Sequence, residues 1–352
     1  MNNKFSNKLQ YPVIGGENKK LFDSAKLKFK ISPGRSQDYK QSVRSPQVSK
    51  SKNTEIGNFF NNFRSTRDKK KSNSPYRFNN LFMKKEYLDT INITTVKNKY
   101  HSVKEYSYCE EKNAKFRDSM EDFSKIIDKY MNDSSKGFFS LYDGHGGSEA
   151  VIFVKERMPE ILANSLEIHS VEDALTTAFK KVDEEVKSHN SENVGCTACI
   201  GLVTNEGGKK YFYCANVGDS KCLLINDKGA NFITEEHRCS NSEEVNRVRQ
   251  AGGIVFNGRV FGQLMLTRAI GDHAMKPYGV LNTPYISKHI VDSKLKYAII
   301  ASDGIWDVMD ENSICTIINK YASLNDVAKG IVKEAENKGS RDNMSCIVLN
   351  FN

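Results

Sequence analysis

The sequence has no apolar run of the ~20 residues that a membrane-spanning helix requires. Its first ten residues, MNNKFSNKLQ, contain neither the apolar core of a secretory signal nor the glycine at position 2 that myristoylation needs. An internal repeat is also absent. These absences predict a soluble intracellular protein without a transmembrane segment, located in the cytoplasm, the nucleus or both.

The sequence also lacks a group of His and Cys residues with the spacing of a zinc site. Its eight cysteines are scattered, and most lie within apolar runs. Cys196 and Cys199 lie in a segment with a strand pattern, where residues three apart point to opposite faces of a sheet. We therefore expect reduced thiols in the core rather than a zinc or redox site.

The charged residues are unevenly distributed. Residues 1–100 contain 22 Lys+Arg against 7 Asp+Glu, whereas residues 101–352 contain 30 against 36. The basic stretch is rich in Asn, Ser and Lys, so it cannot bury enough apolar surface to offset the entropy of ordering it. We predict a mostly disordered basic extension at residues 1–95 and a folded domain at residues 96–352.

The basic extension allows several roles. Its Ser-Pro pairs at Ser32, Ser45 and Ser74 are either linker punctuation or sites for a proline-directed kinase. The basic run at 67–71 could address the nucleus, an anionic membrane or a nucleic acid, but the Arg and aromatic interleaving of a dedicated nucleic-acid binder is missing. We expect targeting, regulation or docking of a partner, with no obligate nucleic acid.

Periodic apolar patterns run through the rest of the chain. Strands are expected at 101–109, 138–142, 196–203, 211–217, 221–225, around 259, 264–266, 297–301 and 344–351. Helices are expected at 148–163, 171–186, 242–250 with Ser242 as N-cap, 311–322 and 324–337. Hairpin-linked strands followed by helices, without regular βαβ alternation, predict an antiparallel α+β fold with helices packed on sheets.

An acidic residue follows the end of each of three apolar strands. Asp143 follows FFSLY, Asp219 follows YFYCANVG and Asp303 follows YAIIAS. Alone, the pair Asp143-Gly144 would be an ordinary turn. Carboxylates at the ends of neighbouring strands would converge on one edge of the sheets, and anions that close need cations beside them.

The candidate ligands are all oxygen donors, which favours Mg²⁺ or Mn²⁺. Two such ions would lower the pKa of a bridging water and clamp a phosphoryl group. Arg117 offers a fork for phosphate oxygens, and His145 could protonate a leaving oxygen. Each residue alone has an ordinary structural explanation. Together, the five acidic motifs at 117–122, Asp143, Asp219, 303–307 and Asp342 favour a catalytic site.

Seven motifs, in this order, resemble the metal-dependent serine/threonine protein phosphatases of type 2C, the PPM family. They are RDSMED (117–122), YDGHGG (142–147), GCTACI (195–200), ANVGDS (215–220), EVNRVRQAGGIVFNGRVFGQLMLTRAIGD (244–272), SDGIWD (302–307) and RDNMS (341–345). The resemblance implies an α+β fold, a β-sandwich of two antiparallel sheets flanked by α-helices. It also implies hydrolysis of phosphoserine and phosphothreonine in proteins by a water activated at a binuclear Mg/Mn centre, without a phosphoenzyme.

The resemblance implies a role for each matching residue. Asp143 would bridge two metal ions, with the Gly144 carbonyl and Glu121 completing one site and Asp303 and Asp342 belonging to the other. Asp219 and Asp307 would contribute to a third, weaker position. The catalytic groups would be Arg117 for phosphate binding, His145 as general acid, Asp122 near the metal waters and Thr197 as a hydroxyl that lines the site. The implied partners are phosphoserine and phosphothreonine proteins, and a monomer is the default state.

The sequence departs from the family pattern in one loop. Glu236-His237-Arg238-Cys239 stands where the family usually has Asp-His-Lys-Pro. The variable flap of the family corresponds to 247–262, where Phe256 and Phe261 are either substrate contacts or core residues. Since every ligand position is filled, an active enzyme is favoured over a catalytically silent member that serves as an interaction or regulatory module.

Overall fold

A computed structural model describes residues 92–94 and 101–352, which belong to one compact unit, Asn79–Asn352. The basic extension predicted at 1–95 lies outside the described residues, apart from the strand β1, Asn92–Thr94. This strand pairs with β2, so the sheet begins before the predicted boundary at residue 96. Three residues are too few to show a period in the sequence. Among the described helices, none has the length and apolar character needed to cross a membrane.

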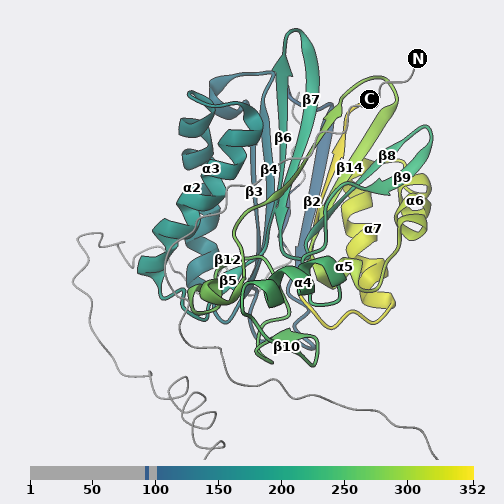
Figure 1. The fold of residues 1–352 in the computed structure, drawn as a ribbon. Coiled ribbons are helices and arrows are strands. Elements are labelled where there is room, and N and C mark those ends of the chain that lie inside the picture. The colour runs from purple at the N-terminus through teal and green to yellow at the C-terminus, as the bar shows by residue number, and fades with distance from the viewer. Residues whose placement is uncertain (1–91, 95–100) are drawn as a thin grey trace, which may run out of the picture. The chain divides into compact units, whose positions relative to one another are not determined.

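The described strands form two large antiparallel sheets and one small hairpin (Figure 1). The first sheet has the order β1-β2-β15-β14-β8-β9. Its strands after β1 are β2 (Glu105–Glu111), β8 (Lys221–Asn226), β9 (Gly229–Phe232), β14 (Leu295–Ala301) and β15 (Met344–Asn350). The predicted strands 221–225, 297–301 and 344–351 are confirmed to within a few residues.

The second sheet has the order β12-β5-β4-β6-β7-β13, with β3 also paired to β4. Its strands are β3 (Asp122–Asp128), β4 (Gly137–His145), β5 (Gly195–Cys196), β6 (Ala198–Glu206), β7 (Lys209–Val217), β12 (Ile270–Gly271) and β13 (Tyr285–Ile290). The predicted hairpin is β6 and β7, with Gly207 and Gly208 at positive φ in its turn.

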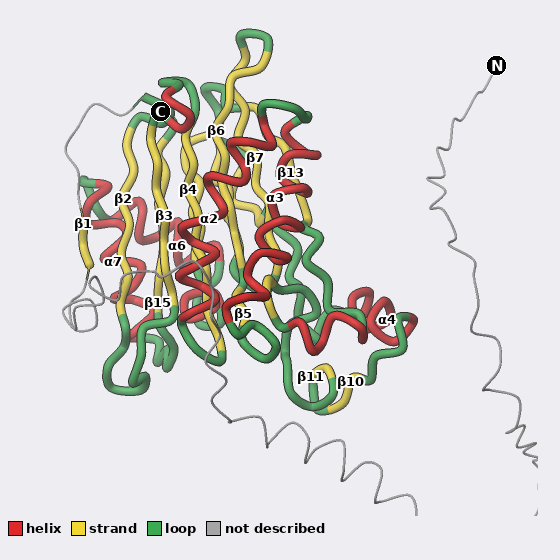
Figure 2. Tube along the Cα trace, turned by 90° about the vertical axis from the view of Figure 1, so that its left-hand side faces the viewer, coloured by secondary structure: helices red, strands yellow, loops and turns green. Residues whose placement is uncertain are grey.

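Most of the helices cover the outer faces of the two sheets, whereas α4 (Ser242–Gln250) lies at one end of the sheets beside the β10 segment (Val255–Phe256) (Figures 1 and 2). The α-helices are α2 (Glu149–Leu166), α3 (Val171–Glu185), α4 (Ser242–Gln250), α5 (Asp303–Trp306), α6 (Glu311–Lys320) and α7 (Leu324–Asn337). Short 3-10 helices lie at η2 (Tyr130–Asn132), η3 (Val186–His189) and η4 (His273–Tyr278). The expected α+β sandwich flanked by helices is therefore confirmed.

Three apolar clusters hold these layers together. One joins α2 and α3 to the second sheet, one lies between the sheets, and one joins the first sheet to α5, α6 and α7. In β4, Phe138 belongs to the helix-facing cluster and Phe139 to the cluster between the sheets. Strands buried on both faces explain why the central runs read as continuously apolar instead of alternating.

Two predicted details were wrong. The N-cap of α4 is Asn241, whose side chain accepts from the N–H groups of Glu243 and Glu244, and Ser242 is the first helical residue. The strand expected at 264–266 is absent from the described chain. Isolated bridges of Leu264 and Leu266 stand there instead, beside the hairpin of β10 (Val255–Phe256) and β11 (Arg259–Val260).

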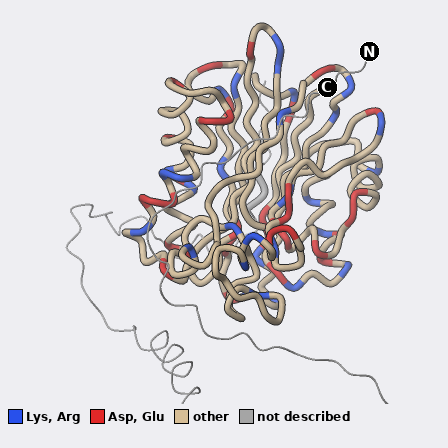
Figure 3. Tube along the Cα trace, in the orientation of Figure 1, with Lys and Arg blue, Asp and Glu red and all other residues tan. Residues whose placement is uncertain are grey.

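The eight cysteines are free, and six are fully buried, as the apolar runs predicted. Acidic and basic positions are interspersed along the described chain (Figure 3).

Candidate active site

The carboxylates of Asp143, Asp219 and Asp303 meet at one end of the sheets. Each provides one oxygen, and these oxygens lie within 4.8 Å of one another. Asp143 lies near the end of β4, Asp219 follows β7, and Asp303 begins α5 just after β14. The convergence predicted from the strand ends is confirmed for these three residues.

The carboxylates of this cluster repel one another. Burial and repulsion from neighbouring carboxylates hold the pKa of Asp143 well above its usual value. Burial, with repulsion from Asp219, raises the pKa of Asp303 to about 8. Of these three carboxylates Asp219 is buried and the other two are half-buried, so their spacing favours a bound cation, and an all-oxygen donor set suits a hard divalent ion. The residues present therefore fit the metal centre of the family.

Gly144, the residue after Asp143, allows a close approach to Glu121 and to Val151. A Cβ on Gly144 would stand 2.8 Å from Val151 Cγ1 and 2.9 Å from the carbonyl oxygen of Glu121. The Gly144 N–H donates to that carbonyl at 2.9 Å, which fixes Glu121 beside the turn. The Glu121 side chain lies outside the cluster of three and accepts from Ser119 Oγ at 3.1 Å.

Arg117 and Asp342 form a second pair beside the cluster. The Arg117 guanidinium donates to Asp342 Oδ2 and, from Nε, to the carbonyl of Arg341 at 3.3 Å. The Arg117 side chain is 47% exposed, so an incoming anion can reach it. Asn343, which the sequence analysis did not single out, accepts from the Glu121 N–H at 2.9 Å and holds the two loops together.

Asp122 is buried behind Asp143, opposite it in the β3–β4 register. Burial raises the pKa of Asp122 to about 7, against the hydrogen bond that Ser302 Oγ donates at 2.7 Å. This placement agrees with an acid that supports the metal site from behind.

Thr197 lies where no substrate reaches it. Its side chain is 2% exposed, and Oγ1 accepts from the Asp143 N–H at 3.1 Å and contacts Ser220 Oγ at 2.7 Å. The predicted hydroxyl lining the site therefore supports the Asp143 backbone, because Thr197 lies between β5 and β6, which both pair with β4.

His145, at the end of β4, has a carboxylate partner that sequence reasoning missed. Its Nε2 lies 2.8 Å from Oδ2 of Asp272, whose side chain is 4% exposed. Burial alone would lower the pKa of His145, but the Asp272 hydrogen bond and charge raise it above its usual value. A Cβ on Gly195 would stand 2.4 Å from Asp272 Oδ2, so glycine makes room for this pair.

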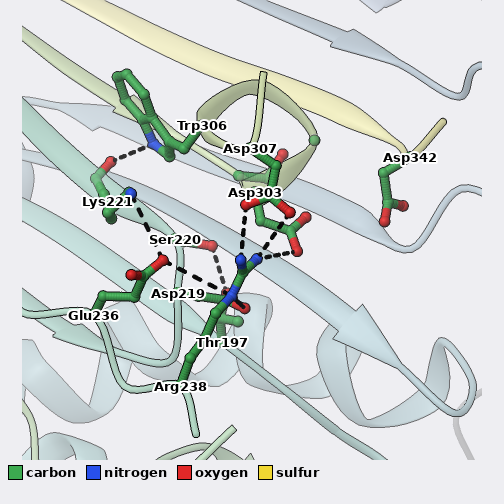
Figure 4. A network of polar contacts seen from close by, with 12 residues as sticks. Thr197, Asp219, Ser220, Lys221, Glu236, Arg238, Asp303, Trp306, Asp307 and Asp342 are labelled. Atoms are coloured by element: carbon green, nitrogen blue, oxygen red, sulfur yellow. Dashed lines mark hydrogen bonds and ion pairs between the residues drawn. The ribbon is translucent and has the colours of Figure 1, made fainter. Parts of the chain in front are cut away.

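Arg238 contributes a positive charge inside the acidic site (Figure 4). Its guanidinium donates to Asp219, Asp303 and Asp307. Asp307 lies outside the cluster of three, and Asp342 stands apart in the same view. In the sequence Arg238 stands out as a departure from the family pattern, but its pairing with these carboxylates is visible only in the fold.

The chain is similar to known proteins. The family model "Protein phosphatase 2C" matches residues 106–344. The chain belongs to the protein phosphatase 2C family. It is therefore a protein serine/threonine phosphatase, as its motifs predicted, and the metal dependence of the family agrees with the acidic cluster.

Individual relatives agree with this membership. "Protein phosphatase 2C homolog 1" of Saccharomyces cerevisiae is 31% identical over 257 residues, covering 68% of this chain and 91% of its own length. The solved structure of a sex-determining protein of C. elegans has a TM-score of 0.63 at 26% identity, covering 70% of this chain and 64% of that one. A serine-threonine phosphatase 2C from Toxoplasma gondii shares the fold, with a TM-score of 0.60 at 19% identity over 75% of this chain and all of its own, 100%.

Proposed function

We propose that this protein phosphatase 2C hydrolyses phosphoserine and phosphothreonine in proteins at a centre of two Mg²⁺ or Mn²⁺ ions. The observation that carries the proposal is the set of three carboxylate oxygens within 4.8 Å at the strand ends. Asp143, Glu121 and the Gly144 carbonyl would hold one ion, and Asp303 and Asp342 the other. When bound, such ions supply a water of lowered pKa and offset charge on the phosphoryl group.

The remaining residues would handle the phosphate and the proton. The half-exposed Arg117 guanidinium would bind the phosphoryl oxygens, sharing its donors with Asp342. His145, charged and oriented by Asp272, would give its proton to the serine or threonine oxygen as that oxygen leaves. Asp122 and Thr197 would hold Asp143 and its surroundings in place.

The cellular location, oligomeric state and partners of the enzyme are also part of this proposal. We place it inside the cell, in the cytoplasm, the nucleus or both, acting as a monomer on phosphoproteins. The basic residues 1–95 would provide docking or targeting toward partners. These assignments rest on the absence of apolar segments in the sequence and on the charge of its N-terminal stretch.

The test is hydrolysis of a phosphothreonine peptide by the purified full chain with Mn²⁺, with Mg²⁺ and with EDTA. We expect phosphate release that needs a divalent ion and that falls by orders of magnitude in Asp143→Asn and Asp303→Asn, since each change removes charge from the metal centre. Glu243→Gln, an exposed carboxylate on α4, is the matched control and should keep normal turnover. Near-normal turnover in both aspartate variants would refute the site assignment.

A further inference from the structure

The backbone that carries Arg238 is held in place beside the acidic cluster. The preceding residue, His237, is fully buried, and its N–H donates to the carbonyl of Gly218 at 3.0 Å. The following residue, Cys239, donates its N–H to the carbonyl of Met265 at 2.9 Å. The loop is fixed on both sides of Arg238, so its side chain starts next to Asp219.

Every nitrogen of the guanidinium meets a carboxylate. Nε donates to Asp219 Oδ2 at 2.6 Å, Nη2 to Asp303 Oδ2 at 2.7 Å and Nη1 to Asp307 Oδ1 at 2.7 Å. The Arg238 side chain is only 14% exposed, and those of Asp219 and Asp303 are 7% and 22% exposed, so these two contacts are made largely out of water, where opposite charges attract strongly. The Asp307 side chain is more open, at 52%. Lysine, the usual family residue here, has one ammonium and could not reproduce this planar fork.

The three carboxylates are engaged to different extents. Asp219 and Asp303 each use only Oδ2 toward Arg238, which leaves Oδ1 for another ligand. Asp307 uses both oxygens, since Nη2 also donates to its Oδ2 at 3.3 Å. The pair that the family resemblance assigns to a third, weaker ion is thus joined by a guanidinium.

We propose that Arg238 is a resident cation that takes the place of the third divalent ion between Asp219 and Asp307. Two ions bind beside it, through Asp143 and the free oxygen of Asp303, and a third binds only by displacing the guanidinium. The same contacts stabilise the metal-free protein by offsetting part of its clustered negative charge. This inference rests on the proposed two-ion centre.

The experiment counts bound Mn²⁺ on the metal-stripped full chain by isothermal titration calorimetry and equilibrium dialysis. The wild type should bind two ions. Arg238→Gln should bind a third ion at least about tenfold more tightly than the wild type does, because the competing charge is gone. Arg249→Gln, an equivalent change at an exposed position of α4, should match the wild type.

Two further readouts do not depend on activity. In EDTA, Arg238→Gln should melt at a lower temperature than the wild type, and Mn²⁺ should raise its melting temperature by a larger amount. Asp307→Asn should still bind two ions, since Arg238 and not an ion is its partner. This variant keeps the inference testable if the metal-free Arg238→Gln protein does not fold.

The outcomes separate this inference from the proposed function. Two ions on the wild type, with no additional ion and no change of affinity in Arg238→Gln, would overturn the role of Arg238 and leave the two-ion centre intact. Loss of an ion in Asp307→Asn would also overturn it. Absence of Mn²⁺ binding to the wild type and to Arg238→Gln alike would overturn the proposed centre, and this inference with it.

Discussion

The carboxylate of Asp272 decides how His145 can act, although 127 residues separate the two in sequence. A buried carboxylate that accepts from one ring nitrogen fixes the orientation of the imidazole and favours its charged form. The Asp272 carboxylate can reach His145 because Asp272 takes a left-handed backbone conformation, with φ of 50°, and because Gly195 carries no side chain.

Asp272→Asn should impair proton donation more than phosphate binding. Hydrolysis of a phosphothreonine peptide should fall by about 10²-fold, since its alkoxide leaving group needs a proton. Hydrolysis of p-nitrophenyl phosphate, whose phenolate leaves readily without a proton, should fall much less. The measurement is kcat and KM for both substrates, in a single set of conditions.

The double variant Asp272→Asn/His145→Ala provides the control. Because the two residues act as one unit, it should lose little more activity than His145→Ala alone. Equal losses on the two substrates in Asp272→Asn would instead mean that Asp272 only maintains the fold.

At the scale of elements, α4 is joined to the neighbouring loop by a buried carboxylate. Glu244, with a side chain 6% exposed, accepts from Arg247 Nη2 at 2.6 Å, Arg268 Nη2 at 2.8 Å and Thr267 Oγ1 at 2.8 Å. Burial raises the pKa of Glu244, but the hydrogen bonds from the two arginines lower it far more. The flap hairpin β10–β11 follows α4, so this contact fixes its base.

Glu244→Gln should lower the free energy of unfolding by ~3 kcal/mol, because it leaves two arginines without their partly buried counter-charge. The measurement is equilibrium denaturation by urea in saturating Mn²⁺. Glu243→Gln removes the same charge from an exposed neighbour on the same helix and should change stability by less than ~0.5 kcal/mol. Similar values for the two variants would show that the buried pairing contributes nothing.

At the scale of the whole molecule, the metal-free protein should lose stability as pH rises. Burial raises the pKa of Asp303 to about 8 and that of Asp122 to about 7, whereas an unfolded Asp titrates near ~3.9. At pH values between the unfolded and the folded pKa, the folded state holds more protons than the unfolded state. The free energy of unfolding therefore falls as the pH rises. A divalent ion that offsets the ionised carboxylates should remove this dependence.

The measurement is the melting temperature of the full chain from about pH 5 to about pH 8, in EDTA and in Mn²⁺. We expect a decline in EDTA, a much flatter profile in Mn²⁺, and a shallower decline for Asp303→Asn in EDTA. A wild-type profile in EDTA as flat as that in Mn²⁺ would contradict the repulsion described above.

Sequence patterns predicted the elements with strong local signals and missed those without them. The amphipathic α3 and the apolar β14 were predicted within a few residues. The edge strand β13 was not, because none of its residues is fully buried and no apolar alternation marks it. β3 was missed for a related reason, since only its first residue, Asp122, is buried.

The sequence by itself determined the family, the α+β class and the three carboxylates at the strand ends, because these depend on local order: an apolar strand followed at once by an acid. Only the tertiary structure decided that Thr197 supports the Asp143 backbone from the neighbouring strands and that Asp272 holds His145. It also decided that Arg238 reaches Asp303 and Asp307, which lie 65 and 69 residues away. Such contacts depend on which loops the two sheets bring together, and no spacing within one segment records that.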